Sequence, residues 1–206
     1  MDLALWAPSA TGDHVHALCA GALKINARAV CVPSGIVARA FAQLEDSPIK
    51  VVALTGFPLG NPDADVKRFE AEAAIDNGAH EIELVLNHGR LAEGDDRAIL
   101  RELRDVVETA DERPVCLSAD CHDFARDQVV HLCHLALDAG ISGISLGTGF
   151  RGRAPMLEHV KLVREATSKK FIIKAAPVAA RELADSLVAA GVDRLGLVFD
   201  AAQPGA

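Results

Sequence analysis

The chain has 206 residues, the length of a single domain, and we expect residues 1–206 to fold as one unit. Its apolar fraction of 50% and charged fraction of 24% are ordinary for a globular protein and exclude a disordered or low-complexity chain. Lys and Arg number 21 against 29 Asp and Glu, a net charge of −8, and an acidic chain without a basic run binds nucleic acid and anionic membranes poorly.

Cysteine usage and the opening segment both predict a cytoplasmic protein. The five cysteines are scattered, odd in number and without a CxxC pair, as expected of reduced thiols. The segment MDLALWAPSATGDH lacks the basic region and the long apolar region of a signal peptide. No run approaches 18 apolar residues, so we expect no membrane-spanning helix.

Eight short apolar runs alternate with amphipathic stretches along the chain. Each run is too short for a helix and most are rich in β-branched residues, so each predicts a buried strand. The runs are Leu3–Trp6, Ala29–Val32, Val51–Leu54, Ile82–Leu86, Val115–Leu117, Ile144–Leu146, Phe171–Ile173 and Leu195–Phe199. Between them, apolar residues at helical spacing predict helices, as at Ile99, Leu103 and Val106.

Three similar junctions indicate how the strands are connected. In AIDNGAHEIEL, LALDAGISGISL and LVAAGVDRLGL a predicted helix ends at a glycine (Gly78, Gly140 and Gly191), and a strand follows two or three residues later. Such short connections predict a parallel sheet with right-handed crossovers. Eight strands fit a compact α/β fold, the (βα)8 TIM barrel, with a helix after the eighth strand missing. A doubly wound open sheet is the alternative.

The ends of the predicted strands carry the candidate functional residues. In a parallel barrel the chemistry lies at the C-terminal ends of the strands. The polar or glycine positions that follow strands include Asn87, His88, Asp120, Thr148, Gly149 and Asp200. Two further ionisable residues, Glu83 and Lys174, lie inside strands.

Lys174 is the strongest indication of chemistry in the sequence. Apolar neighbours predict desolvation, which lowers the pKa of an ammonium and yields a neutral amine able to form a Schiff base with a carbonyl substrate. Alternatively, Lys174 extends out of the barrel mouth or forms a structural pair with Glu83. Glu83 has the same two interpretations, a general acid or base on one hand and the counter-ion of Lys174 on the other.

A metal site and a nucleotide cofactor are not expected. Asp120, Cys121 and His122 are adjacent, and neighbouring residues at a strand end point in different directions, so a polar loop is the favoured interpretation. The glycines after the sixth strand form neither a GxGxxG motif nor a phosphate-binding loop.

Two strings between Lys50 and Leu91 resemble the deoxyribose-phosphate aldolase family. KVVALTGFPLG resembles V-x-x-x-I-G-F-P-L-G, and VKRFEAEAAIDNGAHEIELVLNHGRL resembles V-K-x-x-E-A-x-x-A-I-x-x-G-A-x-E-I-D-x-V. Weaker similarity in DLALWAPSAT, AVCVP, GISLGTGF and IIKAA extends the resemblance over nearly the whole chain. It implies a (βα)8 barrel, class I aldolase ancestry and a substrate-binding role for Cys31.

The chain departs from the family pattern at the positions that carry its chemistry. The family's Schiff-base lysine corresponds to Ser145, whereas the lysine of the seventh strand is kept as Lys174. The catalytic aspartate of E-I-D is Glu83 here. Near the first strand Asp2 is retained, but the following lysine is Ala7.

The resemblance also implies a weakened phosphate site. Of the small residues whose N–H groups bind phosphate in the family, only Thr148 and Gly149 remain, since the Gly-Gly after strand seven is Pro177-Val178 and a carboxylate, Asp200, follows strand eight. We therefore expect a substrate other than a simple sugar phosphate, unless Arg151 or Arg153 supplies an anion site.

Three functions remain open. The first is a carbon–carbon lyase or synthase acting on a small aldehyde or ketone, with Lys174 as the amine and Glu83 or Asp120 moving protons. The second is a barrel enzyme that uses carboxylates without an imine, and the third is a non-catalytic ligand-binding homologue. We expect a small-molecule carbonyl partner, and a homo-oligomer because missing helices would expose apolar barrel surface.

Overall fold

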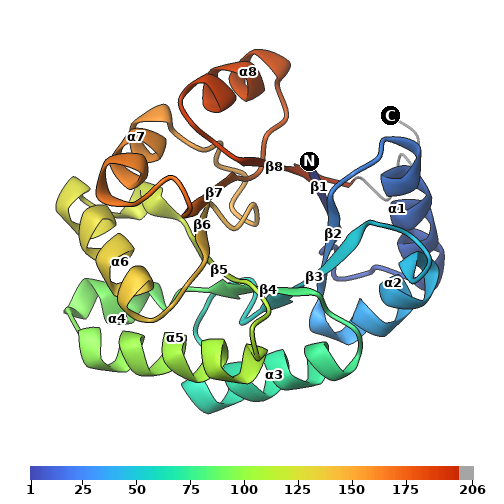
Figure 1. Ribbon diagram of the computed structural model, residues 1–206, viewed down its shortest axis with the longest axis horizontal. Coiled ribbons are helices and arrows are strands. Elements are labelled where there is room, and N and C mark those ends of the chain that lie inside the picture. Colours follow the sequence, from blue (N-terminus) through green and yellow to red (C-terminus); the bar gives the residue numbers. More distant parts are fainter. Residues whose placement is uncertain (200–206) are drawn as a thin grey trace.

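The computed structural model describes residues 1–199, which form a closed barrel of eight parallel strands surrounded by helices (Figure 1). The strands pair in chain order, and β8 closes the barrel against β1. Their bounds are β1 Asp2–Ala4, β2 Ala29–Pro33, β3 Lys50–Thr55, β4 Glu81–Val85, β5 Val115–Ala119, β6 Gly143–Leu146, β7 Ile172–Ala175 and β8 Arg194–Val198. The predicted (βα)8 barrel is confirmed, and the open-sheet alternative is wrong.

Helices on the outside of the barrel connect successive strands (Figure 1). They are α1 Gly12–Lys24, α2 Val37–Leu44, α3 Ala64–Asp76, α4 His88–Glu93, α5 Asp96–Ala110, α6 Arg126–Asp138, α7 Leu157–Ala166 and α8 Arg181–Ala189, with short 3-10 helices η1 Ser34–Ile36 and η2 Cys121–Asp123. The prediction about a helix after β8 and the candidate Asp200 both concern residues 200–206, which lie outside the described residues. Among the described helices, none is long and apolar enough to cross a membrane.

Strand ends fall within two residues of the predicted runs, and the differences follow from the register. Asp2 pairs with Ala29 and Gly196, so β1 begins one residue before the predicted run and ends at Ala4. β7 continues through Lys174, which pairs in register with Ser145 of β6. A charged residue is compatible with a strand here because its side chain faces other polar groups inside the barrel.

The glycine junctions form as the sequence predicts. Gly78 follows α3 with a φ of +96°, and its N–H donates to the Ile75 carbonyl. A Cβ at this position would lie 2.4 Å from Cγ of Phe41, so both the backbone and the packing require glycine. The strand β4 then begins three residues later, at Glu81.

Two kinds of packing surround the strands. The outward-facing residues join the helices in one large apolar core, which includes Leu84, Leu117 and Ile144. Inside the barrel, a smaller apolar cluster of Ala4, Ala29, Cys31, Val52 and Leu54 lies on the β1–β3 side, with Trp6 and Phe57 packed against it. Among the other inward positions are charged and hydroxyl side chains such as Glu83, Ser145 and Lys174, and these form the candidate site.

Candidate active site

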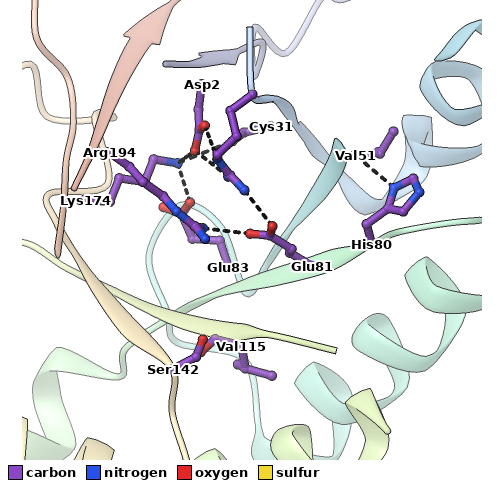
Figure 2. A network of polar contacts seen from close by, with 11 residues as sticks. Asp2, Cys31, Val51, His80, Glu81, Glu83, Val115, Ser142, Lys174 and Arg194 are labelled. Atoms are coloured by element: carbon purple, nitrogen blue, oxygen red, sulfur yellow. Dashed lines mark hydrogen bonds and ion pairs between the residues drawn. The ribbon is translucent and has the colours of Figure 1, made fainter. Parts of the chain in front are cut away.

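Lys174 of β7 lies inside the barrel and is only 4% exposed (Figure 2). Its Nζ is 2.6 Å from Oε2 of Glu83 in β4, 3.4 Å from Oδ2 of Asp2 in β1 and 3.3 Å from Sγ of Cys31 in β2. These residues are far apart in the sequence and meet because inward-facing positions converge when the barrel closes. The structure therefore brings together three predicted candidates and the retained Asp2.

A second set of ion pairs continues the network toward the N-terminal ends of the strands (Figure 2). Arg28 donates from Nε and Nη2 to the two carboxylate oxygens of Asp2, each at 2.8 Å. Nη1 of Arg28 lies 2.6 Å from Glu81, and Nη1 of Arg194 lies 2.8 Å from the same carboxylate. With Lys174 protonated, the network holds three cations and three carboxylates, so its net charge is zero.

The surroundings of Lys174 do not favour the neutral amine that burial alone would give. Burial acts to lower the pKa of Lys174, but the Cys31 sulfur and the carboxylates of Glu83 and Asp2 act in the opposite direction. The net effect places the pKa of Lys174 well above its usual 10.5. The other interpretation, Glu83 as the counter-ion of a buried ammonium, describes this geometry.

Cys31 contributes polarity to the centre without contributing charge. It is fully buried, and burial raises the pKa of its thiol to about 12, with the neighbouring Lys174 ammonium acting against that rise. At neutral pH the side chain is therefore a thiol next to the ammonium.

Ser145 stands beside Lys174, at the position where the family has its Schiff-base lysine. Its hydroxyl is fully buried and donates to the Gly147 carbonyl at 3.2 Å, and Ser118 of β5 donates to the same oxygen at 3.4 Å. The two serines therefore hold the carbonyl of Gly147, the first residue after β6. A serine here can donate a hydrogen bond, but it has no amine for imine formation.

Asp120, which follows β5, holds the β6 loop in place. One carboxylate oxygen, Oδ1, accepts from the Thr148 N–H at 2.9 Å and from the Thr148 hydroxyl at 3.2 Å. The hydroxyl also lies 3.3 Å from Oδ2. Thr148, expected to contribute to an anion site, thus directs both its backbone and side-chain donors to an internal carboxylate.

After β7, too, no backbone N–H of Pro177 or Val178 is left to bind a ligand. Pro177 has no N–H, and the Val178 N–H donates to the Gly196 carbonyl at 2.9 Å. Like the Thr148 N–H, the Val178 N–H is therefore bonded within the protein.

His88 directly follows a strand, but no role was predicted for it. Its Nδ1 lies 3.0 Å from the Leu86 carbonyl, and its Nε2 accepts from the Asp120 N–H at 3.0 Å. These partners require a neutral ring with the proton on Nδ1, and burial lowers the pKa of His88 accordingly. The ring also stacks on Phe124 at 5.3 Å between centroids. Its position directly after a strand, where (βα)8 barrels place their functional residues, was the feature of the sequence that could have indicated it.

A cavity of about 200 Å³ lies over the strand ends, and we call it the mouth pocket. It is lined by Pro58, Leu59, Asn61, His88, Asp120, Asp123, Phe150 and Arg151. These residues come from the loops after β3, β4, β5 and β6. The mouth pocket thus occupies the end of the barrel at which (βα)8 enzymes act.

The remaining candidates lie around this end of the barrel. Arg151 and Arg153 both pair with Asp123, the latter at 2.7 Å. Asn87 caps α4 by accepting from the Arg90 N–H at 3.2 Å. Gly149 lies against Trp6, and a Cβ at Gly149 would be 2.6 Å from that ring.

A larger cavity, of about 410 Å³, lies at the opposite end of the barrel. Its lining includes Leu23, Arg28, Lys50 and Glu81, which lie near the N-terminal ends of strands. In (βα)8 barrels that end contributes mainly to stability. We therefore place the candidate site at the mouth pocket and the Lys174 centre.

A closed parallel barrel, a buried lysine paired with a carboxylate inside it and a pocket at its strand ends together have the architecture of an aldolase-type (βα)8 lyase. A family model described as DeoC/LacD family aldolase matches residues 8–141. The chain therefore belongs to the DeoC/LacD aldolase family, as the sequence resemblance implied, and its function is aldolase-like.

Individual relatives agree with this assignment. The chain is 36% identical over 169 residues to deoxyribose-phosphate aldolase from Streptococcus uberis, covering 81% of this chain and 76% of that protein. It is 32% identical over 192 residues to the enzyme of that name from Caldicellulosiruptor saccharolyticus, covering 91% and 87%. The tetrameric deoxyribose phosphate aldolase structure from Aeropyrum pernix has the same fold, with a TM-score of 0.86 at 22% identity over 95% of this chain and 83% of that one.

Proposed function

We propose that this protein makes or breaks a carbon–carbon bond next to the carbonyl group of a small aldehyde or ketone, with Lys174 acting as an ammonium and not as an imine-forming amine. The observation that carries the proposal is the environment of Nζ, which has the Glu83 and Asp2 carboxylates within 3.4 Å. Family membership supplies the reaction class.

The chemistry follows from where charge develops. In the cleavage direction a base takes the proton of the 3-hydroxyl group, the bond between C2 and C3 breaks, and its electron pair moves through C2 toward the carbonyl oxygen. The resulting enolate then takes a proton at C2, which yields two carbonyl products. A fixed ammonium stabilises the negative oxygen of the enolate, and such preorganised electrostatic stabilisation is a large term in catalysis. Lys174 has that role in our proposal, and Asp120 or Glu83 moves the protons.

An imine at Lys174 would require a different protonation state. The amine must be neutral to attack a carbonyl carbon, and the Glu83 and Asp2 carboxylates within 3.4 Å of Nζ favour the protonated form of Lys174. Its proton would have to pass to Glu83, which would remove the charges that stabilise the pair.

We also propose that the substrate differs from deoxyribose 5-phosphate, the substrate in the name of the curated relatives. The state of the backbone donors supports this, because Pro177 has none, and those of Val178 and Thr148 are already bonded within the protein. A phosphate would also approach the carboxylates of Asp120 and Asp123.

The test is a retro-aldol assay on a panel of unphosphorylated 3-hydroxyaldehydes and on deoxyribose 5-phosphate. We expect turnover of at least one unphosphorylated compound and negligible turnover of the phosphate ester. Lys174→Met should reduce kcat by about 10²–10³-fold, the usual effect of removing one oxyanion donor. Lys174→Arg, which keeps the charge and cannot form this imine, should retain more activity than Lys174→Met.

The exposed Lys161 of α7 provides a matched control, and Lys161→Met should behave as wild type. Absence of turnover on the whole panel would overturn the proposal and favour a ligand-binding homologue. Activity on deoxyribose 5-phosphate above that on the unphosphorylated compounds would overturn the substrate assignment.

A further inference from the structure

The mouth pocket has one apolar wall that the aldol reaction itself does not require. Leu59 and Phe150 line it while remaining 58% and 50% exposed, and Pro58 completes the wall. Phe150 packs edge-on against Phe57, with ring centroids 5.9 Å apart, and Phe57 contacts Trp6 at 5.6 Å. The wall is therefore held in place from behind and offers its apolar face to the pocket.

The lining of the mouth pocket also offers a hydrogen-bond acceptor. Asp120 is 7% exposed, and its Oδ1 already accepts two hydrogen bonds from Thr148. Oδ2 has only the longer 3.3 Å contact with the same hydroxyl, so it retains acceptor capacity. A ligand hydroxyl group is the donor that matches this oxygen.

Positive charge at the rim is already neutralised within the protein. Arg151, the one cation of the lining, pairs with Asp123, and Arg153 pairs with the same carboxylate. Among the lining residues the carboxylates outnumber the cations. An anionic ligand would have to displace Asp123 and approach Asp120, whereas an uncharged ligand meets neither obstacle.

The size of the mouth pocket limits the ligand. A cavity of about 200 Å³ holds roughly six or seven groups the size of a water molecule, at about 30 Å³ each. That is enough for a short hydrocarbon chain carrying two oxygen functions.

We propose that the mouth pocket binds an uncharged 3-hydroxyaldehyde through both of its ends, with the hydroxyl group donating to Asp120 and an apolar tail of a few carbons lying against Leu59 and Phe150. This inference rests on the proposed function for the identity of the ligand. It adds a specificity determinant, the apolar wall, which selects for chain length and against charge.

Binding can be measured separately from turnover with unreactive analogues. We would titrate the full-length protein with butane-1,3-diol, hexane-1,3-diol and 3-hydroxybutyl phosphate, following binding by ligand-observed NMR or calorimetry. Each methylene that is removed from water should raise the affinity up to about fourfold, so hexane-1,3-diol should bind more tightly than butane-1,3-diol, and 3-hydroxybutyl phosphate most weakly.

Variants assign the effect to residues. Leu59→Ser and Phe150→Ala should abolish the dependence on chain length, and their exposed positions allow the fold to be retained, as checked by circular dichroism. Asp120→Asn should weaken both diols by a similar factor. Phe69→Ala is the matched control, because Phe69 is also 58% exposed but lies on α3 beneath Arg68, outside the mouth pocket.

Two outcomes would overturn the inference. One is equal affinity for the two diols in the wild type. The other is tighter binding of 3-hydroxybutyl phosphate than of the diols, lost in Arg151→Met, which would show that Arg151 makes the mouth pocket an anion site. Binding that depends on chain length, without turnover of any aldehyde, would refute the proposed function and support the apolar wall as a binding site. Turnover with equal affinities for the two diols would support the proposed function and refute the role of the apolar wall.

Discussion

Lys174 is tolerated inside the barrel because carboxylates from two other strands surround it. A buried ammonium loses its hydration, and only close counter-ions compensate for that loss. The network achieves this with Glu83 at 2.6 Å and Asp2, which Arg28 orients through two hydrogen bonds. Removing one partner therefore leaves an unpaired charge in a nearly water-free interior.

The first prediction concerns Glu83→Gln. Breaking a buried ion pair by removing one partner costs about 3–5 kcal/mol, and we expect a loss of this size in the free energy of unfolding, measured by urea denaturation at pH 7. Asp65→Asn is the control, since Asp65 forms an exposed pair with Arg101 at 3.0 Å, and its loss should cost no more than about 1 kcal/mol. A Glu83→Gln variant as stable as wild type would show that the pair contributes nothing.

The second prediction concerns pH and His88. Its pKa is lowered from 6.5 in the folded state, so the unfolded chain binds the proton more tightly. The stability that this group contributes is complete above pH 6.5 and is lost as pH falls toward the folded pKa. The difference in unfolding free energy between wild type and His88→Gln should be constant above pH 7 and should narrow below pH 6.5.

Denaturation curves at several pH values measure this difference. His134→Gln, at an exposed position in α6, provides the comparison for the loss of a histidine. A pH-independent difference for His88→Gln would contradict the protonation state assigned to the ring.

At the scale of elements, the loop after β6 is the part of the site that a single substitution tests most cleanly. Gly149 has a φ of +77°, and a Cβ there would lie 2.6 Å from Cη2 of Trp6. Gly152 has a similar φ of +66°, but a Cβ there would meet nothing within 4 Å. An alanine at either position would therefore be strained by the positive φ, but only at Gly149 would its Cβ also clash with Trp6.

The third prediction compares Gly149→Ala with Gly152→Ala. Both should lose about 1–2 kcal/mol of stability because alanine is strained at positive φ. Gly149→Ala should lose more and should also shift the fluorescence emission of Trp6, the single tryptophan of the chain, because the ring must move. An unchanged emission spectrum in Gly149→Ala would contradict the packing of Trp6 on the loop.

The positions of the elements were predictable because local pattern determines them. A short apolar run buried on both faces identifies a strand, and a glycine at positive φ identifies the end of a helix, as at Gly78. The end of β1 was misplaced because Leu5 and Trp6 continue the apolar run, although Trp6 packs over the mouth of the barrel instead of in its wall.

The candidate site was only partly predictable because its contacts are long-range. Lys174 and Glu83 stand out locally as ionisable residues in apolar strands, and their pairing was one of the two interpretations. Arg28 and Glu81 are separated by 53 residues, and only the closed register brings them together. The direction of the pKa shift of Lys174 depends on that network, so local hydrophobicity alone could not decide between the two interpretations.

At the scale of the whole molecule, exposed apolar side chains support the expected homo-oligomer. Large apolar residues at least 40% exposed include Leu23, Ile25, Val66, Phe69 and Val188. The fourth prediction is that size-exclusion chromatography with light scattering gives a mass of at least twice the 21.7 kDa of the chain. A mass equal to that of one chain would contradict it.

We propose that the barrel as a whole encloses a charge-balanced centre in which Lys174 is an ammonium, and borohydride trapping tests this claim most directly. The protein would be incubated with a panel of aldehydes and ketones, including those it turns over, and treated with borohydride, which reduces an imine to a stable adduct. Intact mass and peptide mapping would then locate any label. We predict that Lys174 remains unmodified under conditions in which turnover is observed, whereas a reduced substrate adduct on Lys174 would contradict the ammonium assignment and restore imine chemistry to this position.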